Sequence, residues 1–277
     1  MNRALVMMDI SGLGRCALGV ALPTLCAMGV QAVPLPMGVL SAHTGGFGQV
    51  ARADLTDFAA QSLAHYESLG TAFQAIYAGY LLSDDQIPLL ARALTANPGA
   101  FSLIDPVMGD YGKYYTSIAP SRAAAYRKLC PLADLITPNH TEAHLLLDAA
   151  QPLPHEALLC GLLELGCRSA LVKGVPMPGG GAANVYRSRE DKAPLVVPYA
   201  PEPGAYPGTG DLFASILLGA LLRGESPEDA ISRAANFVRD AIALTNSQGT
   251  APKEGVAFEA IVHTLANEVG TKCKFPS

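Results

Sequence analysis

Pro207-Gly208-Thr209-Gly210-Asp211-Leu212-Phe213-Ala214-Ser215 joins a glycine-rich turn to the start of an apolar run. Two glycines bracket Thr209, so the backbone can turn tightly there and present its N–H groups. The apolar run from Leu212 to Leu222 predicts a helix, with Gly224 as its stop signal. A glycine turn that enters a helix N-terminus is suited to bind an anion, because unpaired N–H groups and the helix dipole point at the ligand.

Asp211 directly follows this turn, and its carboxylate has two possible roles. It could cap the N-terminus of the helix. It could instead act as a general base beside a bound phosphate. These nine residues alone leave both roles open.

The composition limits the class of protein. With 277 residues, 50% of them hydrophobic and 16% charged, the chain can bury a large core in one α/β domain or in two smaller ones. A net charge of −5 argues against a nucleic-acid-binding protein, which needs a basic face. The six cysteines form no CxxC pair and have no histidine at zinc spacing, so we expect small core residues in a reducing cytosol.

The N-terminal region is unusually poor in charge. Arg15 is the only charged residue between Asp9 and Arg52, which raises the possibility of a membrane span. Prolines and glycines interrupt this region, and the pattern therefore favours a buried helix followed by a buried strand. The first residues show no clear cleavage site, so we expect no signal peptide.

Short apolar runs alternate with helical patterns along the chain. The alternation predicts a mostly parallel sheet with helices on both faces. We expect strands at residues 4–8, 32–40, 75–80, 101–104, 134–139 and 171–174, and a hairpin that pairs 185–187 with 195–197. We expect helices at residues 15–28, 54–69, 84–96, 121–129, 212–222, 228–245 and 258–269, and one that starts near 141.

The Gly12-x-Gly14-x-x-Ala17 spacing after the first strand is similar to a dinucleotide fingerprint. That fingerprint requires an acidic residue about 20 positions further on to hold the ribose. No Asp or Glu lies between Asp9 and Asp54, so we exclude nicotinamide binding. The glycines instead favour close approach of a ligand to the backbone near Ser11.

Polar segments follow the ends of most expected strands. They are Ser41–Gly48, Gly79-Tyr80, Asp105–Asp110, Thr137–Asn139 and Lys173. Each alone could be a connector, a solvated turn, a helix cap at Asn139 or Thr141, or a lysine that extends to water. Because open α/β sheets bind ligands beyond the carboxyl ends of their strands, the repetition favours a binding site. The two aspartates after 101–104 suit a metal–phosphate site.

Four segments together resemble a known family. Asp105-Pro-Val-Met-Gly-Asp110, Thr137-Pro-Asn139-x-x-Glu142, Val172-Lys173 and Gly208-Thr-Gly-Asp211 occur in the order typical of the ribokinase superfamily. Ser11, the Ser41-Ala-His-Thr44 loop and Gly79-Tyr80 resemble the pyridoxal kinase branch. The first two segments are shared with hydroxymethylpyrimidine kinases. The resemblance covers nearly the whole chain.

The resemblance implies roles for individual residues. Asp211 would take the proton from the 5′-hydroxymethyl group of the substrate, beside an anion hole formed by Gly208, Thr209 and Gly210. The residues that would hold the pyridine ring are Ser11, Thr44, Gly45 and Tyr80, together with Asp211. The residues that would contact ATP are Asp105, Thr137, Asn139, Glu142, Lys173 and Thr209. Asp110 and Glu142 would position Mg²⁺, partly through water, and Tyr115 would belong to a flap over ATP.

The resemblance also implies the activity and the organisation. It implies one ribokinase-like α/β domain over residues 1–277, with a mostly parallel central sheet and a reduced lid, that forms a cytoplasmic homodimer without nucleic-acid or membrane partners. The implied reaction is ATP- and Mg²⁺-dependent phosphorylation of pyridoxal, pyridoxamine or pyridoxine. Whether a monovalent cation is needed stays open. The Ser11-Gly-Leu-Gly14 loop and Gly45-Gly46 depart from the family pattern and leave the preferred vitamer open.

Three alternatives are retained. A hydroxymethylpyrimidine kinase of thiamine synthesis is the nearest, and Ser11 with the Thr44 loop favours the pyridine substrates over it. A sugar kinase fits less well, because the N-terminal half lacks the acidic, Asn/Gly-rich sugar-binding pattern. A non-catalytic vitamer-binding protein would not need Asp211 as a base.

Overall fold

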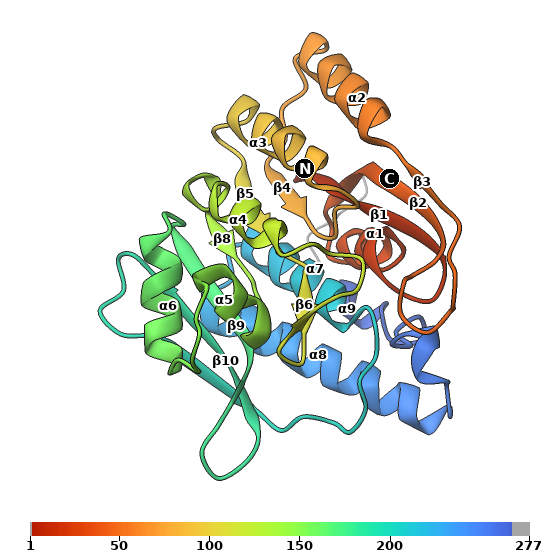
Figure 1. Ribbon diagram of the computed structural model, residues 1–277. Coiled ribbons are helices and arrows are strands. Elements are labelled where there is room, and N and C mark those ends of the chain that lie inside the picture. Colours follow the sequence, from red (N-terminus) through yellow and green to blue (C-terminus); the bar gives the residue numbers. More distant parts are fainter. Residues whose placement is uncertain (1, 268–277) are drawn as a thin grey trace, which may run out of the picture.

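A nine-stranded sheet forms the centre of the protein, and the computed structural model describes residues 2–267 (Figure 1). The strand order is β11-β10-β9-β8-β5-β4-β1-β2-β3. The strands of this sheet are β1 (Arg3–Leu13), β2 (Gln31–Ala42), β3 (Arg52–Asp54), β4 (Ala75–Ala78), β5 (Phe101–Ile104), β8 (Leu135–Ile136), β9 (Ser169–Pro176), β10 (Ala182–Ser188) and β11 (Leu195–Tyr199). A separate two-stranded hairpin consists of β6 (Gly109–Asp110) and β7 (Lys113–Tyr114).

The middle of the sheet is parallel, as the alternation of strands and helices predicts. All pairings from β2 through β1, β4, β5 and β8 to β9 are parallel, whereas β3, β10 and β11 pair antiparallel at the edges. All four residues of β4 are buried, as expected for a central parallel strand covered on both faces. The expected hairpin in the 185–197 region is confirmed as β10–β11.

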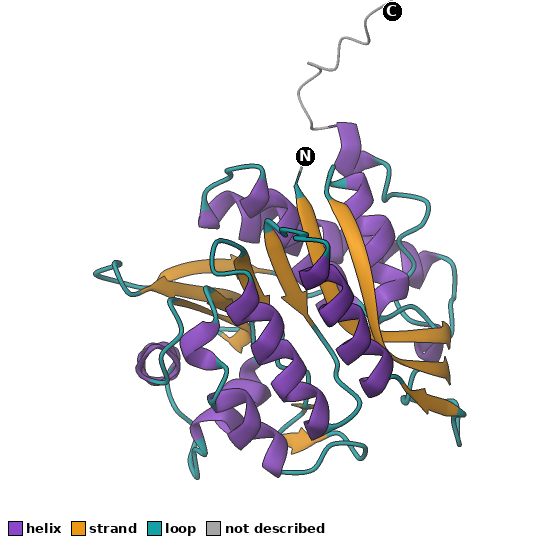
Figure 2. Ribbon diagram, turned by 90° about the horizontal axis from the view of Figure 1, so that it is seen from above, coloured by secondary structure: helices purple, strands orange, loops and turns teal. Residues whose placement is uncertain are grey.

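Helices cover both faces of the sheet (Figure 2). One core packs the sheet against α2 to α6, and the other packs it against α1, α7 and α8. Every residue from Leu212 to Ala220 on α7 is buried, which fits a helix that is apolar on all sides. The helices are α1 (Ala17–Ala27), α2 (Thr56–Ser68), α3 (Ile87–Ala96), α4 (Ser121–Arg127), α5 (His140–Leu147), α6 (His155–Glu164), α7 (Thr209–Leu222), α8 (Pro227–Ser247) and α9 (Thr264–Asn267).

A bulge in β2 lies opposite the carboxyl end of β1. Met8 pairs with Pro36 and Ile10 pairs with Val39, so two residues of β2, Met37 and Gly38, lie opposite Asp9. Bulges bend a strand locally and redirect its side chains, often next to functional sites. This bulge lies where β1 continues beyond the expected end at residue 8 to include Ser11.

Several sequence expectations are wrong in detail. The expected helix 258–269 is helical only over Thr264–Asn267, and positions 268 and 269 lie outside the described residues. Helix α6 and the β6–β7 hairpin were not expected. Cys26 is exposed, not a core residue, whereas Cys130 and Cys167 are buried. In the described part of the chain, no helix combines the length and apolar character needed to cross a membrane.

Candidate active site

The N-terminus of α7 has the geometry expected from its glycine turn. Gly208 is the N-cap residue and adopts a left-handed conformation, with φ of 84°. A Cβ atom at this position would lie 2.1 Å from the carbonyl oxygen of Arg15, so only glycine fits. Because Gly208 occupies the cap position, the interpretation of Asp211 as the N-cap is wrong. Thr209, Gly210 and Asp211 form the first turn, where helical N–H groups lack intrahelical partners.

The Asp211 carboxylate bonds across the molecule to the start of α1. Its Oδ2 accepts a hydrogen bond of 2.7 Å from the backbone N–H of Ala17. Ala17 has a positive φ of 47°, which is unusual for a residue with a side chain. The Arg15 N–H donates to the carbonyl of Glu254 at 3.1 Å and so anchors the preceding residues. Two segments 194 positions apart therefore fix the orientation of Asp211.

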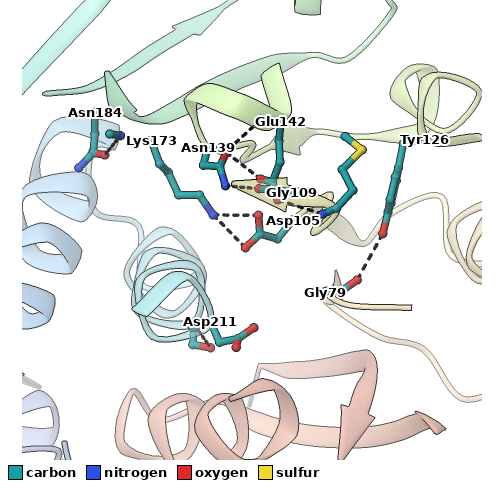
Figure 3. Close-up of polar contacts among 12 residues, drawn as sticks. Gly79, Asp105, Gly109, Tyr126, Asn139, Glu142, Lys173, Asn184 and Asp211 are labelled. Atoms are coloured by element: carbon teal, nitrogen blue, oxygen red, sulfur yellow. Dashed lines mark hydrogen bonds and ion pairs between the residues drawn. The ribbon is translucent and has the colours of Figure 1, made fainter. Parts of the chain in front are cut away.

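A buried ion pair lies beside the first turn of α7 (Figure 3). Lys173 on β9 donates to both carboxylate oxygens of Asp105, at 2.8 and 2.9 Å. A Cβ atom placed on Gly210 would lie 3.8 Å from the Lys173 Nζ, so the ammonium adjoins the helix N-terminus. Thr137, at the end of β8, is fully buried. These residues meet because β5, β8 and β9 end at the same edge of the sheet.

Asn139 and Glu142 form a capping box at the start of α5. The Asn139 side chain accepts from the Glu142 N–H, and the Glu142 Oε2 accepts from the Asn139 N–H, both at 2.8 Å. The other Glu142 oxygen accepts from the Met108 N–H at 3.0 Å, and Asn139 Nδ2 donates to the Gly109 carbonyl at 2.9 Å. The Gly112 N–H donates to the Thr141 hydroxyl. These bonds attach the β6–β7 hairpin to α5.

Buried carboxylates outnumber the buried cation in this region. Burial, together with the carboxylates of Asp105 and Asp9, raises the pKa of Asp211 to about 7, against the lowering effects of the Ala17 N–H and Lys173. Burial and Asp105 likewise raise the pKa of Glu142 to about 8. Burial opposes the charge on Lys173, but Asp105 and Glu142 raise its pKa overall, so it is a cation at neutral pH.

The residues expected to bind the substrate make fewer hydrogen bonds with one another than the residues expected to bind ATP. Ser11 is buried and donates to Asp9, whereas Tyr80 is half-buried and donates to the Ser117 hydroxyl at 3.2 Å. Thr44 and Gly45 are exposed. The loop that carries them is held by His43, whose Nδ1 accepts from the Gly45 N–H and whose Nε2 bonds to the Lys253 carbonyl at 2.7 Å.

Asp110 lies on β6 of the hairpin, and Tyr115 directly follows β7. Asp110 is exposed, and its Oδ1 accepts from the Tyr111 N–H. Burial raises the pKa of the Tyr115 phenol, and the carboxylates of Glu142, Asp110, Asp105 and Asp211 add to the shift. Tyr115 is therefore near these acids, while 40% of its surface stays exposed.

The donor set fits Mg²⁺ held mainly through water and phosphate. Within residues 2–267, no three His, Cys, Asp or Glu side chains converge on a point where they could hold a metal ion by themselves. Mg²⁺ is usually bound by one or two carboxylates, several waters and substrate phosphates. Glu142 and Asp110 are the carboxylates that the family resemblance implies for this role, and a nearby cation would favour the ionised form of Glu142, whose pKa is raised by burial.

Sequence reasoning missed three residues of this region. Asp9 lies two residues before Ser11, and His43 directly precedes Thr44. The prediction of Ser11 and Thr44 as site residues was therefore the signal that could have led to Asp9 and His43. Ala17 carried no signal, because the interaction uses its backbone N–H and a left-handed conformation.

Comparisons with known proteins identify the family of this chain. The family model described as phosphomethylpyrimidine kinase matches residues 20–256. A Lactobacillus plantarum pyridoxal kinase structure is 31% identical, with 96% of this chain and 97% of that chain covered and a TM-score of 0.90. A Bacteroides thetaiotaomicron structure with pyridoxal, of a protein described as a phosphomethylpyrimidine kinase, is 33% identical, with 95% of each chain covered and a TM-score of 0.87.

One curated relative matches over a shorter span. The chain is 30% identical to a pyridoxal kinase from Actinobacillus succinogenes, over 62% of this chain and 63% of that enzyme. The fold is that of the ribokinase-like kinases. The chain belongs to the phosphomethylpyrimidine kinase family.

Proposed function

We propose that this protein is a kinase that transfers the γ-phosphoryl group of ATP to the 5′-hydroxymethyl group of vitamin B6 vitamers. The observation that carries the proposal is the position of Asp211. It lies in the first turn of α7, at a helix N-terminus suited to bind an anion, beside the Asp105–Lys173 pair. Its pKa of about 7 suits a general base at neutral pH.

The chemical roles follow from these positions. Asp211 accepts the hydroxyl proton as the substrate oxygen attacks phosphorus. The N–H groups of the first turn of α7 and the Lys173 ammonium stabilise the charge on the transferring phosphoryl group. Glu142 and Asp110 are the candidate carboxylates for Mg²⁺, which when bound supplies charge neutralisation on the phosphates. Phosphoryl transfer requires from a protein mainly this kind of positioning and charge stabilisation.

The pyridine substrate is supported by the relatives. The kinases from L. plantarum and A. succinogenes are named for pyridoxal, and the B. thetaiotaomicron protein was crystallised with it. The second candidate, hydroxymethylpyrimidine phosphorylation, is favoured by the description of the family model. We further propose the substrate contacts of Ser11, Thr44, Gly45 and Tyr80, and the ATP contacts of Asp105, Thr137 and Asn139.

The organisation of the protein is proposed on the same resemblance. We infer one domain over residues 1–277, a homodimer and a cytoplasmic location, without nucleic-acid or membrane partners. Light scattering on the purified protein measures the dimer directly, and a monomeric mass at all concentrations would contradict it.

The proposed function is tested by release of ADP from purified protein with ATP and Mg²⁺. Pyridoxal, pyridoxamine, pyridoxine and hydroxymethylpyrimidine are supplied one at a time. Turnover with a pyridine vitamer supports the proposal. Turnover with the pyrimidine alone would assign the protein to the second candidate, and pyridoxal binding without ADP release would indicate a non-catalytic binder.

A further inference from the structure

Two glycines that are distant in sequence lie against the backbone of Arg15, just before α1. Gly208 at the start of α7 and Gly255 both have a positive φ, of 84° and 78°. A Cβ atom on Gly208 would lie 2.1 Å from the Arg15 carbonyl oxygen. A Cβ atom on Gly255 would lie 2.8 Å from the same oxygen and 2.9 Å from the Arg15 nitrogen. A side chain at either position would therefore displace the Arg15 backbone.

Hydrogen bonds join the three segments into one junction. The Arg15 N–H donates to the Glu254 carbonyl at 3.1 Å, and the Arg15 Nη1 donates to the same oxygen at 3.2 Å. The Val256 N–H donates to the Pro207 carbonyl at 3.1 Å, next to the glycine turn of α7. Residues 254–256, the support segment, therefore contact both Arg15 and the turn that precedes α7.

The protein core holds the support segment in place. Val256 and the two residues after it, Ala257 and Phe258, are 0%, 2% and 3% exposed. The Ala257 N–H donates at 2.8 Å to the hydroxyl of Thr245, which is fully buried on α8. Such a segment is a rigid support, because a shift would expose apolar surface or leave a buried polar group unpaired.

The junction ends at the proposed base. Ala17 lies two residues after Arg15, and its N–H donates to the Asp211 carboxylate at 2.7 Å. Ala17 has a positive φ of 47°, which a residue with a side chain adopts only when the surrounding structure imposes it. The contacts of Gly208 and Gly255 with Arg15 supply such a constraint.

We propose that Gly255 is a positioning residue that, through the backbone of Arg15, holds the Ala17 N–H against Asp211 and so fixes the orientation of the proposed base. The inference rests on the proposed function, in which Asp211 takes the proton from the substrate hydroxyl. Gly255 provides space and backbone contact and takes no part in the transfer itself. A reacting group that is misplaced by about 1 Å can lower the rate about 10²-fold, so this support matters for turnover.

The first test compares kcat in Gly255→Ala and in the matched control Gly249→Ala. Both glycines have a positive φ, of 78° and 63°, so both substitutions strain the backbone. In the described part of the chain, a Cβ atom on Gly249 would meet nothing within 4 Å beyond its own chain neighbours. We expect kcat to fall about 10²-fold in Gly255→Ala, with KM for ATP unchanged, and to stay within about twofold in Gly249→Ala. Equal kcat values in the two variants would overturn the proposal.

The second test is the pH dependence of kcat/KM, which a purely structural role would not shift. The Ala17 N–H lowers the pKa of Asp211, so its displacement should move the midpoint of the acid limb upward from about 7 by about one pH unit. The other titratable groups that interact with Asp211 are Asp9, Cys16, Tyr77, Asp105, Tyr115 and Lys173. The atoms nearest to a Cβ on Gly255 all belong to Arg15 and not to these groups. A midpoint equal to that of the parent protein would contradict the proposed role.

Amide hydrogen exchange distinguishes this inference from the proposed function, because it needs no turnover. In the parent protein the Ala17 N–H should exchange slowly, since it donates to the Asp211 carboxylate. We expect its protection to fall about tenfold in Gly255→Ala and to be unchanged in Gly249→Ala. Selective loss of protection supports the inference even if no ADP is released. Equal protection in the two variants overturns it even if ADP is released.

Arg15→Met tests the same junction if Gly255→Ala does not fold. It removes the Nη1 bond to the Glu254 carbonyl and the ion pair with Glu259. We expect kcat to fall about fivefold, as for the loss of one neutral hydrogen bond. Arg92→Met is the control, because it removes a comparable surface ion pair, that with Glu67. Equal kcat values in these two variants would overturn the proposal.

Discussion

The two ends of the candidate site differ in how firmly the chain itself holds them. At the proposed nucleotide end, Lys173 is hydrogen-bonded to Asp105, and Glu142 accepts from the N–H groups of Asn139 and Met108, in buried or part-buried surroundings. At the proposed substrate end, Thr44 and Gly45 are exposed on a loop fixed through His43. We infer that the proposed positions for phosphate and metal are built in advance, because misplaced charges are costly there. The ring-binding loop can vary with the substrate.

The largest effect is expected from breaking the buried ion pair. In Lys173→Met, Asp105 would lose the partner of its carboxylate while only 2% of its side chain is exposed. We expect the free energy of unfolding to fall by about 3–5 kcal/mol, measured by urea denaturation. Lys192→Met, at an exposed lysine, should change it by less than about 0.5 kcal/mol. If both variants lose the same small amount, the nucleotide end is not held by this pair.

A second prediction concerns pH and the carboxyl group between the two ends. Asp211 must be ionised to act as a base, and its pKa is raised to about 7. Below that pH, kcat/KM for the vitamer should fall about tenfold per pH unit. A flat profile between pH values of about 5 and 8 would argue against Asp211 as the base.

The free energy of unfolding should decrease as the pH rises through this range, whereas kcat/KM should increase. The pKa of Asp211 is raised from 3.8 to about 7, so the folded state binds the proton more tightly than the unfolded chain does. Its contribution is fully present below the unfolded value and is lost as the pH rises through about 7. Urea denaturation of Asp211→Asn should show a smaller decline over this range, although Asp9 and Glu142 contribute in the same direction. An undiminished decline would mean that Asp211 is not perturbed.

The smallest effect is expected at the substrate loop. His43→Ala removes the bonds to the Gly45 N–H and the Lys253 carbonyl, each worth about 1 kcal/mol. We expect KM for the vitamer to rise about tenfold, with KM for ATP unchanged. His65→Ala on the exposed surface of α2 is the control. A parallel rise in both KM values would show that the two ends are not independent.

The sequence predicted the centre of the fold well, for physical reasons. Parallel strands buried on both faces must be continuous apolar runs, and Phe101–Ile104 was placed without error. Helix α6 was missed, although its buried leucines pack on the sheet. The expected helix at 258–269 failed because an apolar pattern alone does not establish a helix there.

The site could be predicted only where side-chain types reveal the chemistry. Asp105 and Lys173 were singled out because charged groups at strand ends are informative, and Glu142 was singled out by the family resemblance; the structure pairs Lys173 with Asp105. The spacing of Asn139 and Glu142 could indicate a cap or a metal site, and the structure shows a capping box with a raised Glu142 pKa. The bond from Ala17 to Asp211 could not be foreseen, since it depends on a backbone conformation and on contact between distant segments.

The most direct test of the central claim is single-turnover phosphoryl transfer by the parent protein and by Asp211→Asn, with ATP affinity measured on both. We expect phosphorylated pyridoxal from the parent protein, a rate about 10²–10⁴-fold lower in the variant, and unchanged ATP binding. Transfer by the variant at a rate near that of the parent protein would contradict it.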